Sequence, residues 1–263
     1  MCITILGSCS GTEPMPGRRH TSWILQHRGR PYCFDAGEGC SSSAHLLGVE
    51  LLQLRHIFIS HPHLDHTGGL PNLLWTIRKL TTRQAYEPGF TLTVHTPALQ
   101  QFQSALDFLR HTEGSFHCDF NIVPQQVQDG LILSEEGLTV EARHNYHLGQ
   151  NGDGQWLSFS FRISKDHRRI VYSGDVRGLD DLGDWLNNCD LLMMETGHHS
   201  PEKICRELRQ PGHMVRKLLF LHHGREILQD PEGARRKATQ AFGEEVLIAE
   251  DGMHITVPGT PEP

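Results

Sequence analysis

Residues 56–69 read HIFISHPHLDHTGG. The apolar, β-branched start of this stretch predicts a buried strand, and the glycine pair at its end lets the chain turn tightly into a following helix. Three imidazoles and one carboxylate lie between the two, within six residues: His61, His63, Asp65 and His66. Nitrogen and oxygen donors of this kind suit zinc, and two-metal sites hold their ions about 3.5–4 Å apart. The stretch therefore predicts a metal centre rather than a histidine-rich surface turn.

Polar side chains also follow four other apolar runs of the chain. Asp35 comes after PYCF, His147 after LTVEARHNY, Asp175 after RRIVYSG and His222 after LLFL. Residues just past strand ends can converge on one edge of a sheet, where loops carry sites on a rigid scaffold. The repetition predicts that these side chains and the histidines of the first stretch belong to one site.

The chain has 263 residues, which one hydrophobic core can still support, and no linker or low-complexity segment divides it. We therefore expect a single domain over residues 1–263. The hydrophobic pattern predicts strands over Cys2–Leu6, Ser22–Gln26, Pro31–Phe34, His56–Ser60, Phe90–Val94, Leu138–Ala142, Leu157–Ile163, Arg169–Ser173, Leu191–Met194, Lys217–Leu221, Val246–Ala249 and His254–Val257. It predicts helices over Glu38–Leu47, Pro71–Leu80, Pro97–Arg110, Asp181–Asn187, Pro201–Leu208 and Gly233–Phe242. Mixed strands with interspersed helices indicate a layered α/β domain.

The composition limits the function. Hydrophobic residues make up 37% and charged residues 21%, which is ordinary for a folded protein. The net charge of −7 gives the chain no general attraction to nucleic acid or to an anionic membrane, whereas 19 histidines favour a metal site. Seven cysteines without a CxxC pair argue against a zinc ribbon and a disulfide framework. Because no signal-like or membrane-spanning stretch is visible, we expect a cytoplasmic protein without a membrane partner.

The HPHLDH motif resembles the HxHxDH signature of the metallo-β-lactamase superfamily. Further segments are similar to its ribonuclease Z-like branch, in the order of that family: ITILGSCSGTEPMPGRRHTSWIL, CFDAGEG, FISHPHLDHTGGLPNLL, VEARHNYH, YSGDVRG, DLLMMETGHHS, LLFLHHGRE and IAEDGMHITV. Together they span nearly the whole chain. The resemblance implies the metallo-β-lactamase fold, an α/β four-layered αββα sandwich in which helices flank two mixed sheets.

The resemblance also implies two divalent metal ions and their ligands. One ion would be bound by His61, His63 and His147, the other by Asp65, His66 and His222, with Asp175 bridging the two. Zinc is the expected metal, and manganese and iron are the alternatives. Asp35 matches the aspartate with which the family orients its ligand histidines.

Two ligand positions have competing candidates. His144 and His147 lie three residues apart; we favour His147, since family members place the histidine about five residues beyond the small residue that matches Ala142. His222 and His223 are adjacent, and we favour His222 because it comes directly after LLFL.

The chemistry follows from the resemblance as well. A hydroxide that bridges two divalent ions is a nucleophile at neutral pH, and the ions neutralise the charge of an anionic substrate. Glu195 and His198, in METGHHS, resemble residues assigned to proton donation, so we expect His198 to be the general acid and Glu195 to orient it. Asp65 and Asp35 complete the expected catalytic set. A surface or helix-capping role is the alternative for His198.

Four functions are consistent with such a centre: hydrolysis of a small phosphodiester or cyclic phosphate, ribonuclease Z-like trimming of transfer-RNA 3′ ends, hydrolysis of a thioester, lactone or β-lactam, and metal binding without catalysis. Ribonuclease Z enzymes usually carry a tRNA-gripping arm between the residues that match His147 and Asp175, but here Asp175 lies only 28 positions after His147. An acidic chain without that arm would bind a long polyanion poorly. We therefore rank the small phosphodiester first and RNA second.

A homodimer is a further expectation from the resemblance. We also expect Thr81–Pro88 and His111–Asp119 to form loops beside the cleft.

Overall fold

The structure, a computed structural model, describes residues 1–113 and 117–257, and these form two compact units. The first unit consists of Met1–Ser8, Pro14–Gln126 and the residues from Glu250 onward; the second consists of Cys9–Glu13 and Val127–Ala249. Within the described ranges, each unit is built on one mixed sheet of seven strands. The α/β expectation is thereby confirmed, whereas a single domain over the whole chain stays a prediction.

The first unit contains the strands β1 (Cys2–Gly7), β2 (Ser22–His27), β3 (Arg30–Phe34), β4 (His56–Phe58), β5 (Thr91–Thr96), β6 (Asn121–Gln126) and β14 (His254–Thr256). Its helices are α1 (Cys40–Leu46), α2 (Leu64–Thr67), α3 (Leu70–Thr81) and α4 (Leu99–Thr112), with a 3₁₀ turn at Leu51–Gln53. The strand order is β14-β1-β2-β3-β4-β5-β6. Neighbours from β14 to β3 run antiparallel, and neighbours from β3 to β6 run parallel. The carboxyl ends of β3, β4 and β5 therefore meet at one edge of the sheet.

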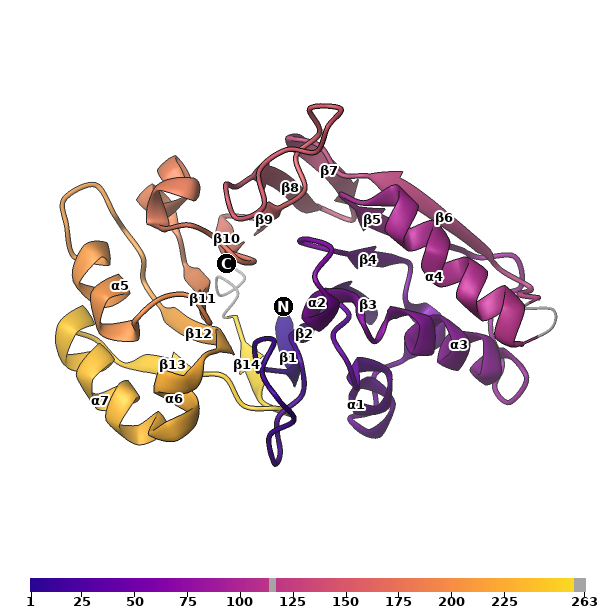
Figure 1. Cartoon of the computed structure of the whole chain (residues 1–263), viewed down its shortest axis with the longest axis horizontal. Helices are drawn as coiled ribbons and strands as arrows, with labels where there is room; N and C mark the ends of the chain where they lie inside the picture. Colours follow the sequence, from indigo (N-terminus) through magenta and orange to yellow (C-terminus); the bar gives the residue numbers. More distant parts are fainter. Residues whose placement is uncertain (114–116, 258–263) are drawn as a thin grey trace. The chain divides into compact units, whose positions relative to one another are not determined.

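Helices α1, α3 and α4 cover one face of this sheet (Figure 1). The buried face follows the alternation of the strands: Ile24, Cys33, Ile57 and Val94 come from four neighbouring strands and belong to one core cluster with the helices. Helix α3 begins with Pro71 in its first turn, where a missing N–H is tolerated. The helices thus hold the parallel strand ends in place.

The second unit contains the strands β7 (Gly130–Glu135), β8 (Leu138–His144), β9 (Phe159–Lys165), β10 (Arg168–Tyr172), β11 (Leu191–Thr196), β12 (Leu218–His223) and β13 (Val246–Ile248). Its helices are α5 (Pro201–Leu208), α6 (Arg225–Gln229) and α7 (Pro231–Phe242), with 3₁₀ turns at Leu179–Asp181 and Gly183–Asn188. The strand order is β13-β12-β11-β10-β9-β8-β7, parallel from β13 to β10 and antiparallel from β10 to β7. Because β8 and β10 both run antiparallel to β9, the carboxyl ends of β8, β10, β11 and β12 lie at the same edge.

Helices α5, α6 and α7 pack together over the parallel half of the second sheet (Figure 1). Val171, Leu192 and Phe220 come from three neighbouring strands and share a core cluster with Ile204 of α5 and Phe242 of α7. Across the described part of the chain, no helix combines the length and the hydrophobicity that a membrane crossing requires.

All predicted strands are present, with ends that differ by no more than two residues. The strands β6 and β7 and the short helices α2 and α6 were not predicted. Both strands lie at the edge of their sheet, and most of their side chains are exposed or half-buried. Without a buried face, an edge strand carries no regular hydrophobic alternation, and Pro124 within β6 further masks its strand character.

The α-helix predicted over Asp181–Asn187 is wrong, because two 3₁₀ turns occupy this region. Gly183, the first residue of the second turn, has a φ of 51° in the left-handed region, which a continuous right-handed α-helix does not allow. The loop predicted over His111–Asp119 begins within α4, which continues to Thr112. Residues 114–116 of that loop lie outside the described part of the chain.

We expect Leu74→Ala in α3 to lower the free energy of unfolding by about 2–5 kcal/mol, since Leu74 is completely buried in the core of the first unit. The matched control is Leu46→Ala in α1, where the leucine is 76% exposed and the change should stay within about 0.5 kcal/mol. Urea unfolding of both variants measures the difference. Equal losses of stability would contradict the assignment of this core.

Candidate functional site

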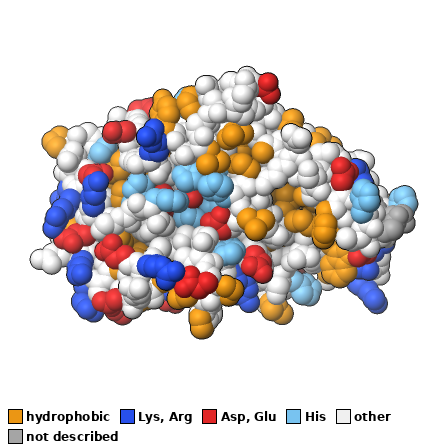
Figure 2. Space-filling model, in the orientation of Figure 1, with side chains coloured by type: hydrophobic (Ala, Val, Ile, Leu, Met, Phe, Trp, Pro, Cys, Tyr) orange, Lys and Arg blue, Asp and Glu red, His pale blue; other side chains and the backbone are white. Residues whose placement is uncertain are grey.

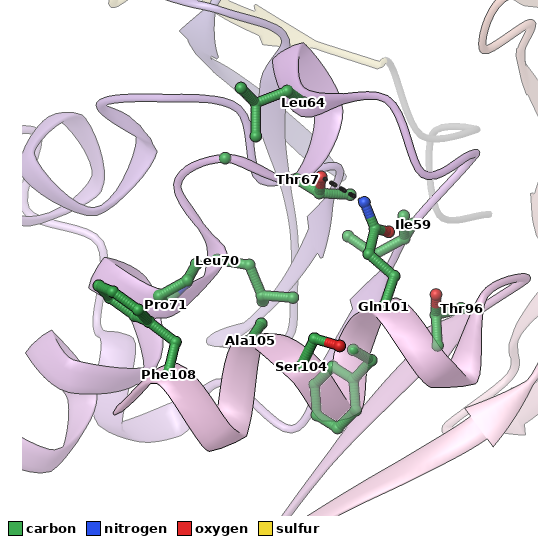
Figure 3. A pocket seen from close by; sticks show the side chains of 12 residues that line it. Ile59, Leu64, Thr67, Leu70, Pro71, Thr96, Gln101, Ser104, Ala105 and Phe108 are labelled. Carbon is green, nitrogen blue, oxygen red and sulfur yellow. Dashed lines mark hydrogen bonds between the residues drawn. The ribbon is translucent and has the colours of Figure 1, made fainter. Parts of the chain in front are cut away.

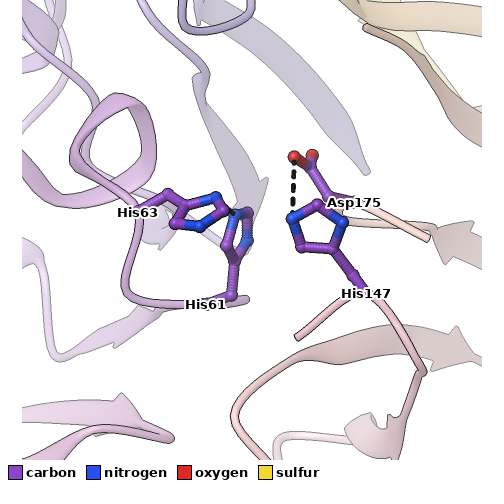
Figure 4. A group of neighbouring side chains, drawn as sticks. All are labelled: His61, His63, His147 and Asp175. Atoms are coloured by element: carbon purple, nitrogen blue, oxygen red, sulfur yellow. Dashed lines mark hydrogen bonds and ion pairs between the residues drawn. The ribbon is translucent and has the colours of Figure 1, made fainter. Parts of the chain in front are cut away.

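The HPHLDH loop follows β4 in the first unit and leads into α2. His61 is fully buried, while His63 is exposed. Nε2 of His61 lies 3.0 Å from Nδ1 of His63, and Nδ1 of His61 lies 3.1 Å from the hydroxyl of Ser60. The two imidazoles of this pair lie close together, with an angle of 76° between their planes (Figure 4). Two ring nitrogens therefore point toward one position at the end of β4.

The carboxylate of Asp35 fixes the orientation of this loop. It accepts hydrogen bonds from the backbone N–H of Ser60 at 2.7 Å and from the Ser60 hydroxyl at 2.9 Å. The same carboxylate lies 2.8 Å from Nδ1 of His66, and all three residues are fully buried. This bond turns Nε2 of His66 toward Asp65, whose carboxylate lies 3.7 Å away. A carboxylate on the far nitrogen of an imidazole is the usual arrangement around metal-bound histidines.

Two glycines allow the loop to approach the end of β3. A Cβ at Gly69 would lie 2.2 Å from the carbonyl oxygen of Gly37, and a Cβ at Gly37 would lie 2.4 Å from the carbonyl oxygen of Asp65. The backbone leaves no room for any side chain at either position. The N–H of Gly69 donates to the carbonyl of Ala36, which ties the start of α3 to the residue after Asp35.

An apolar cavity of about 300 Å³ lies between the HPHLDH loop and α4 (Figure 3). Leu64, Leu70, Pro71 and Phe108 are among its lining residues. Gln101 of α4 reaches across its margin, where its amide donates to the carbonyl of Pro62 and lies 3.5 Å from the Thr67 hydroxyl. The helix thus braces the loop from its exposed side.

In the second unit, three imidazoles surround one carboxylate oxygen of Asp175, which follows β10. Oδ2 lies 3.2 Å from Nε2 of His222, 3.8 Å from Nε2 of His147 and 3.8 Å from Nδ1 of His198. The pair of His147 and Asp175 is visible in Figure 4. Donor atoms of Asp175, His198 and His222 all lie within 4.8 Å of one another, which is close enough for one ion to join them. Asp175 is 2% exposed, so this carboxylate is held away from bulk water.

The two adjacent histidines at the end of β12 have different surroundings. His223 is fully buried, and its ring nitrogens lie 2.8 Å from the carbonyl of Ala249 and 3.2 Å from the Thr196 hydroxyl. His222 instead turns toward Asp175, with a backbone φ of 53°. A Cβ at Gly197 would lie 2.8 Å from the His222 ring, so the glycine makes room for it. The surroundings favour His222 as the ligand and give His223 a structural role.

His144 and His147 differ in the same way. The carboxylate of Asp129 holds His144 through both its backbone N–H and its Nδ1, each at 2.6 Å. The ring of His144 stacks on Trp156, with the centroids 4.1 Å apart. His147 has its N–H bonded to the side chain of Asn145 and its ring beside Asp175. The geometry favours His147 as the ligand.

Glu195 lies at the end of β11 and is 1% exposed, and it contacts the two histidines of METGHHS. Its carboxylate accepts from the N–H of His198 at 2.9 Å and lies 3.1 Å from Nδ1 of that ring. His199 also faces Glu195, with Nε2 at 3.4 Å, and bonds to the carbonyl of Val176 at 2.9 Å. Since 48% of the His198 side chain is exposed, this imidazole can meet a molecule from solution.

Imidazole is accessible on the face drawn in Figure 2, where several histidine side chains reach the surface. Other histidines are purely internal. His95 of β5 is 1% exposed, and its Nε2 lies 3.1 Å from Nδ1 of His56. Burial, with a smaller contribution from His56, lowers the pKa of His95 to about 3. His95 is therefore neutral at neutral pH and packs as an aromatic ring against Phe58.

The C-terminal DGM segment anchors the basic loop of the first unit. Asp251 accepts hydrogen bonds from the N–H and hydroxyl of Ser8 and from the N–H of Arg19. Burial raises the pKa of the Asp251 carboxyl, although these hydrogen bonds act in the opposite direction. Arg18 donates to Ser8 and lies 3.8 Å from Glu250. Both arginines are thus engaged within their own unit.

The sequence interpretation missed three supporting residues: Ser60, Gln101 and His199. Ser60 contacts Asp35, His61 and His66, and its place directly before the HPHLDH motif is the signal that could have revealed it. No comparable signal exists for Gln101, since it reaches the motif from a helix 34 residues along the chain from Thr67. His199 stands next to His198, and its contact with Glu195 depends on how the chain turns after β11.

The comparisons with known proteins agree with the motifs. A family model described as "Beta-lactamase superfamily domain" matches residues 31–228, about three quarters of the chain. Ribonuclease Z of Methanosarcina acetivorans is 22% identical, covering 99% of both chains, and ribonuclease Z of Haloferax volcanii is 24% identical, covering 98% of this chain and 95% of its own. The first alignment runs over 316 positions, so the relative has segments that this chain lacks.

Solved structures share the fold. The short form of human tRNase Z matches with a TM-score of 0.70 and 22% identity, covering 98% of this chain and 100% of its own. The metallo-β-lactamase fold protein YhfI of Bacillus subtilis matches with a TM-score of 0.75 and 18% identity, covering 97% and 98%. The expected metallo-β-lactamase fold is confirmed. By its family match, its full-length relatives and its fold, the chain belongs to the metallo-β-lactamase superfamily, in the ribonuclease Z-like branch.

Proposed function

We propose that this protein is a metal-dependent phosphodiesterase that binds two divalent ions. The ligand set is His61, His63, Asp65, His66, His147, Asp175 and His222. The observation that carries the proposal is the Asp175 carboxylate oxygen with three imidazoles 3.2–3.8 Å away. A buried carboxylate among imidazoles suits a shared cation, because protonated imidazoles alone would repel one another. The donors are nitrogen and oxygen atoms, which fit zinc first and manganese or iron as alternatives.

The residues around the ligands have distinct tasks. Bound divalent ions would acidify a water molecule and neutralise the charge of a phosphodiester. Asp35 and Ser60 hold the rings of His61 and His66 in fixed orientations, with their outer nitrogens turned to the site. Asp65 contributes its carboxylate beside His66. Preorganised groups of this kind need no rearrangement during the reaction.

His198 is the proposed general acid. Its Nδ1 lies 3.1 Å from the buried Glu195 carboxylate, and nearly half of the side chain is open to solvent. A histidine in this setting can donate a proton to a leaving alkoxide. Glu195 orients the ring by a second bond to the backbone of the same residue.

RNA is the substrate class that the relatives favour. The relatives that match over their full length are ribonuclease Z enzymes, and the matched human protein is a tRNase Z. This reverses the ranking drawn from charge and spacing, in which a small phosphodiester came first. The small phosphodiester is the second candidate, supported by one observation. Residues 145–158 between β8 and β9 form a short turn closed by a bridge between Gln150 and Trp156, with no arm for gripping RNA.

Hydrolysis of three substrates by the zinc-loaded protein tests the proposal: bis(p-nitrophenyl) phosphate, a panel of cyclic phosphates, and a precursor tRNA with a 3′ trailer. We expect turnover of the p-nitrophenyl diester and cleavage of the trailer. Turnover of the small diesters with an intact trailer would select the second candidate. No turnover of any of the three would overturn the function.

Asp175→Ala is the matching inactive variant. It should lose bound zinc and at least about 100-fold in activity, because the carboxylate shared by three imidazoles is gone. Asp153→Ala, at an exposed turn of the same unit, is the control. Elemental analysis and the p-nitrophenyl assay report the two effects. Retention of both metal and activity by Asp175→Ala would show that the ligand set is wrong.

His222→Ala and His223→Ala should behave differently although the residues are adjacent. We expect His222→Ala to lower the zinc content, with a smaller effect on folding. His223→Ala should retain zinc but lower the free energy of unfolding by about 1–3 kcal/mol, because it leaves buried partners at Ala249 and Thr196. Zinc analysis and urea unfolding distinguish them. If His223→Ala lost zinc while His222→Ala retained it, His223 would be the ligand and His222 the structural residue.

His198→Ala should slow only those substrates whose leaving group needs a proton. We expect a loss of about 100-fold or more for an alkyl leaving group such as a ribose hydroxyl, the usual contribution of a general acid. Release of p-nitrophenolate needs no protonation and should change little. Equal rates for wild type and His198→Ala on a ribonucleotide diester would rule out the acid role.

A further inference from the structure

The end of β8 and the loop that follows it carry an aromatic cluster, defined here as His144, Tyr146 and Trp156, whose members flank the ligand candidate His147 in the sequence. The His144 ring stacks on Trp156 with centroids 4.1 Å apart and an interplanar angle of 14°. Tyr146 stands edge-on to both, at 5.3 Å and 89° to Trp156 and at 5.7 Å and 83° to His144. Tyr146 is nevertheless 50% exposed. Part of its surface is therefore available to a ligand.

Hydrogen bonds within the loop and to Asp129 hold this cluster in place. Asn151 accepts from the N–H groups of Asp153 and Gln155, and its own N–H donates to the Gln155 carbonyl, which closes the turn. The N–H of Leu157 donates to the carbonyl of Gly149. At the other end, the Asp129 carboxylate holds His144. A ring fixed in advance loses little entropy when a ligand stacks on it.

A cavity of about 440 Å³ adjoins His144 and Tyr146 in the same unit. Its lining carries more carboxylates than guanidinium groups: Asp129, Glu141, Asp180 and Asp181 against Arg143 and Arg162. The two arginines are engaged as well, Arg143 with Asp184 at 2.6 Å and Arg162 with Glu141 at 2.8 Å. A phosphate group would be repelled here. Asp129, Asp181 and Glu141 already accept hydrogen bonds, and each carboxylate oxygen has a second lone pair that can accept one from a sugar hydroxyl.

We propose that the aromatic cluster is a nucleoside subsite, in which an unpaired base of the substrate stacks on Tyr146 and its ribose occupies the adjoining cavity. This rests on the proposed phosphodiesterase function, because Tyr146 directly precedes His147 in the chain and would place the base next to the reacting phosphate. Bases lifted out of a stack are commonly bound on aromatic side chains. Stacking does not depend on charge, so a chain of net charge −7 whose described β8–β9 segment forms no RNA-gripping arm could still hold a nucleotide.

Two diesters with the same leaving group test the subsite on the zinc-loaded, full-length protein: thymidine 5′-(4-nitrophenyl) phosphate and ethyl 4-nitrophenyl phosphate. Tyr146→Ala should lower kcat/KM for the thymidine ester by about 5- to 100-fold, mostly through KM, which is the range for loss of one base–aromatic stack. The ethyl ester should be hydrolysed as by wild type. Tyr146→Phe should keep the wild-type kcat/KM for the thymidine ester, since stacking needs the ring and not the hydroxyl.

Two further variants guard against indirect effects. Trp156→Ala, nine positions beyond His147, should show the same selectivity, and Phe108→Ala, an aromatic residue 60% exposed in the first unit, should change neither ester. Zinc content is measured on each sample. Equal losses on both esters for Tyr146→Ala and Trp156→Ala would overturn the subsite and leave the cluster as a support for His147.

Binding of adenosine to the wild-type protein, followed by tryptophan fluorescence, separates this inference from the proposed function because it needs no turnover. We expect saturable quenching that Trp156→Phe reduces and Tyr146→Ala weakens. A protein that binds adenosine but hydrolyses no diester would keep the subsite and lose the proposed reaction. A protein that hydrolyses diesters but shows no adenosine binding and no preference between the two esters would do the reverse.

Discussion

The buried carboxylate of Asp35 is the constraint on which the HPHLDH loop of the first unit depends. It binds the backbone and hydroxyl of Ser60 and the ring of His66 at once, so the HPHLDH loop cannot shift without breaking three hydrogen bonds in a fully buried place. Such bonds are expensive to lose, since each leaves a polar group without water. At Gly37 and Gly69 the absence of a side chain lets the loop pack closely against the end of β3.

In the second unit a buried carboxylate also contacts the imidazoles, but here it is itself a candidate ligand. There the carboxylate of Asp175 lies among the imidazoles, and the supporting bonds come from neighbouring strand ends: Glu195 holds His198, and Asn145 holds the backbone of His147. In both units the candidate ligands follow strands whose carboxyl ends share one edge. Such edges are where layered α/β proteins place their sites, because the loops there rest on a rigid sheet.

The strands and most helices could be predicted because their hydrophobic periodicity reflects a buried face. Edge strands β6 and β7 escaped, since exposure removes that periodicity, and Gly183 broke a helix that composition alone suggested. The ligand candidates could be named from their spacing and from the family resemblance. The choice within each histidine pair could only be supported by tertiary contacts: Asp129 and Trp156 engage His144, and Ala249 and Thr196 engage His223. Contacts between residues far apart in the chain leave no local signal, as Gln101 illustrates.

Asp35 and His222 both have left-handed backbones, with φ values of 54° and 53°. Aspartate, asparagine and histidine enter this region more readily than most side chains, and β-branched residues hardly enter it. The chemical demand for a carboxylate or an imidazole is thus combined with a conformational demand at the same position. A substitution at either position therefore has to meet two requirements. A side chain with suitable donor atoms must also tolerate the left-handed backbone. Glycine fits this backbone best but has no side-chain donor atom.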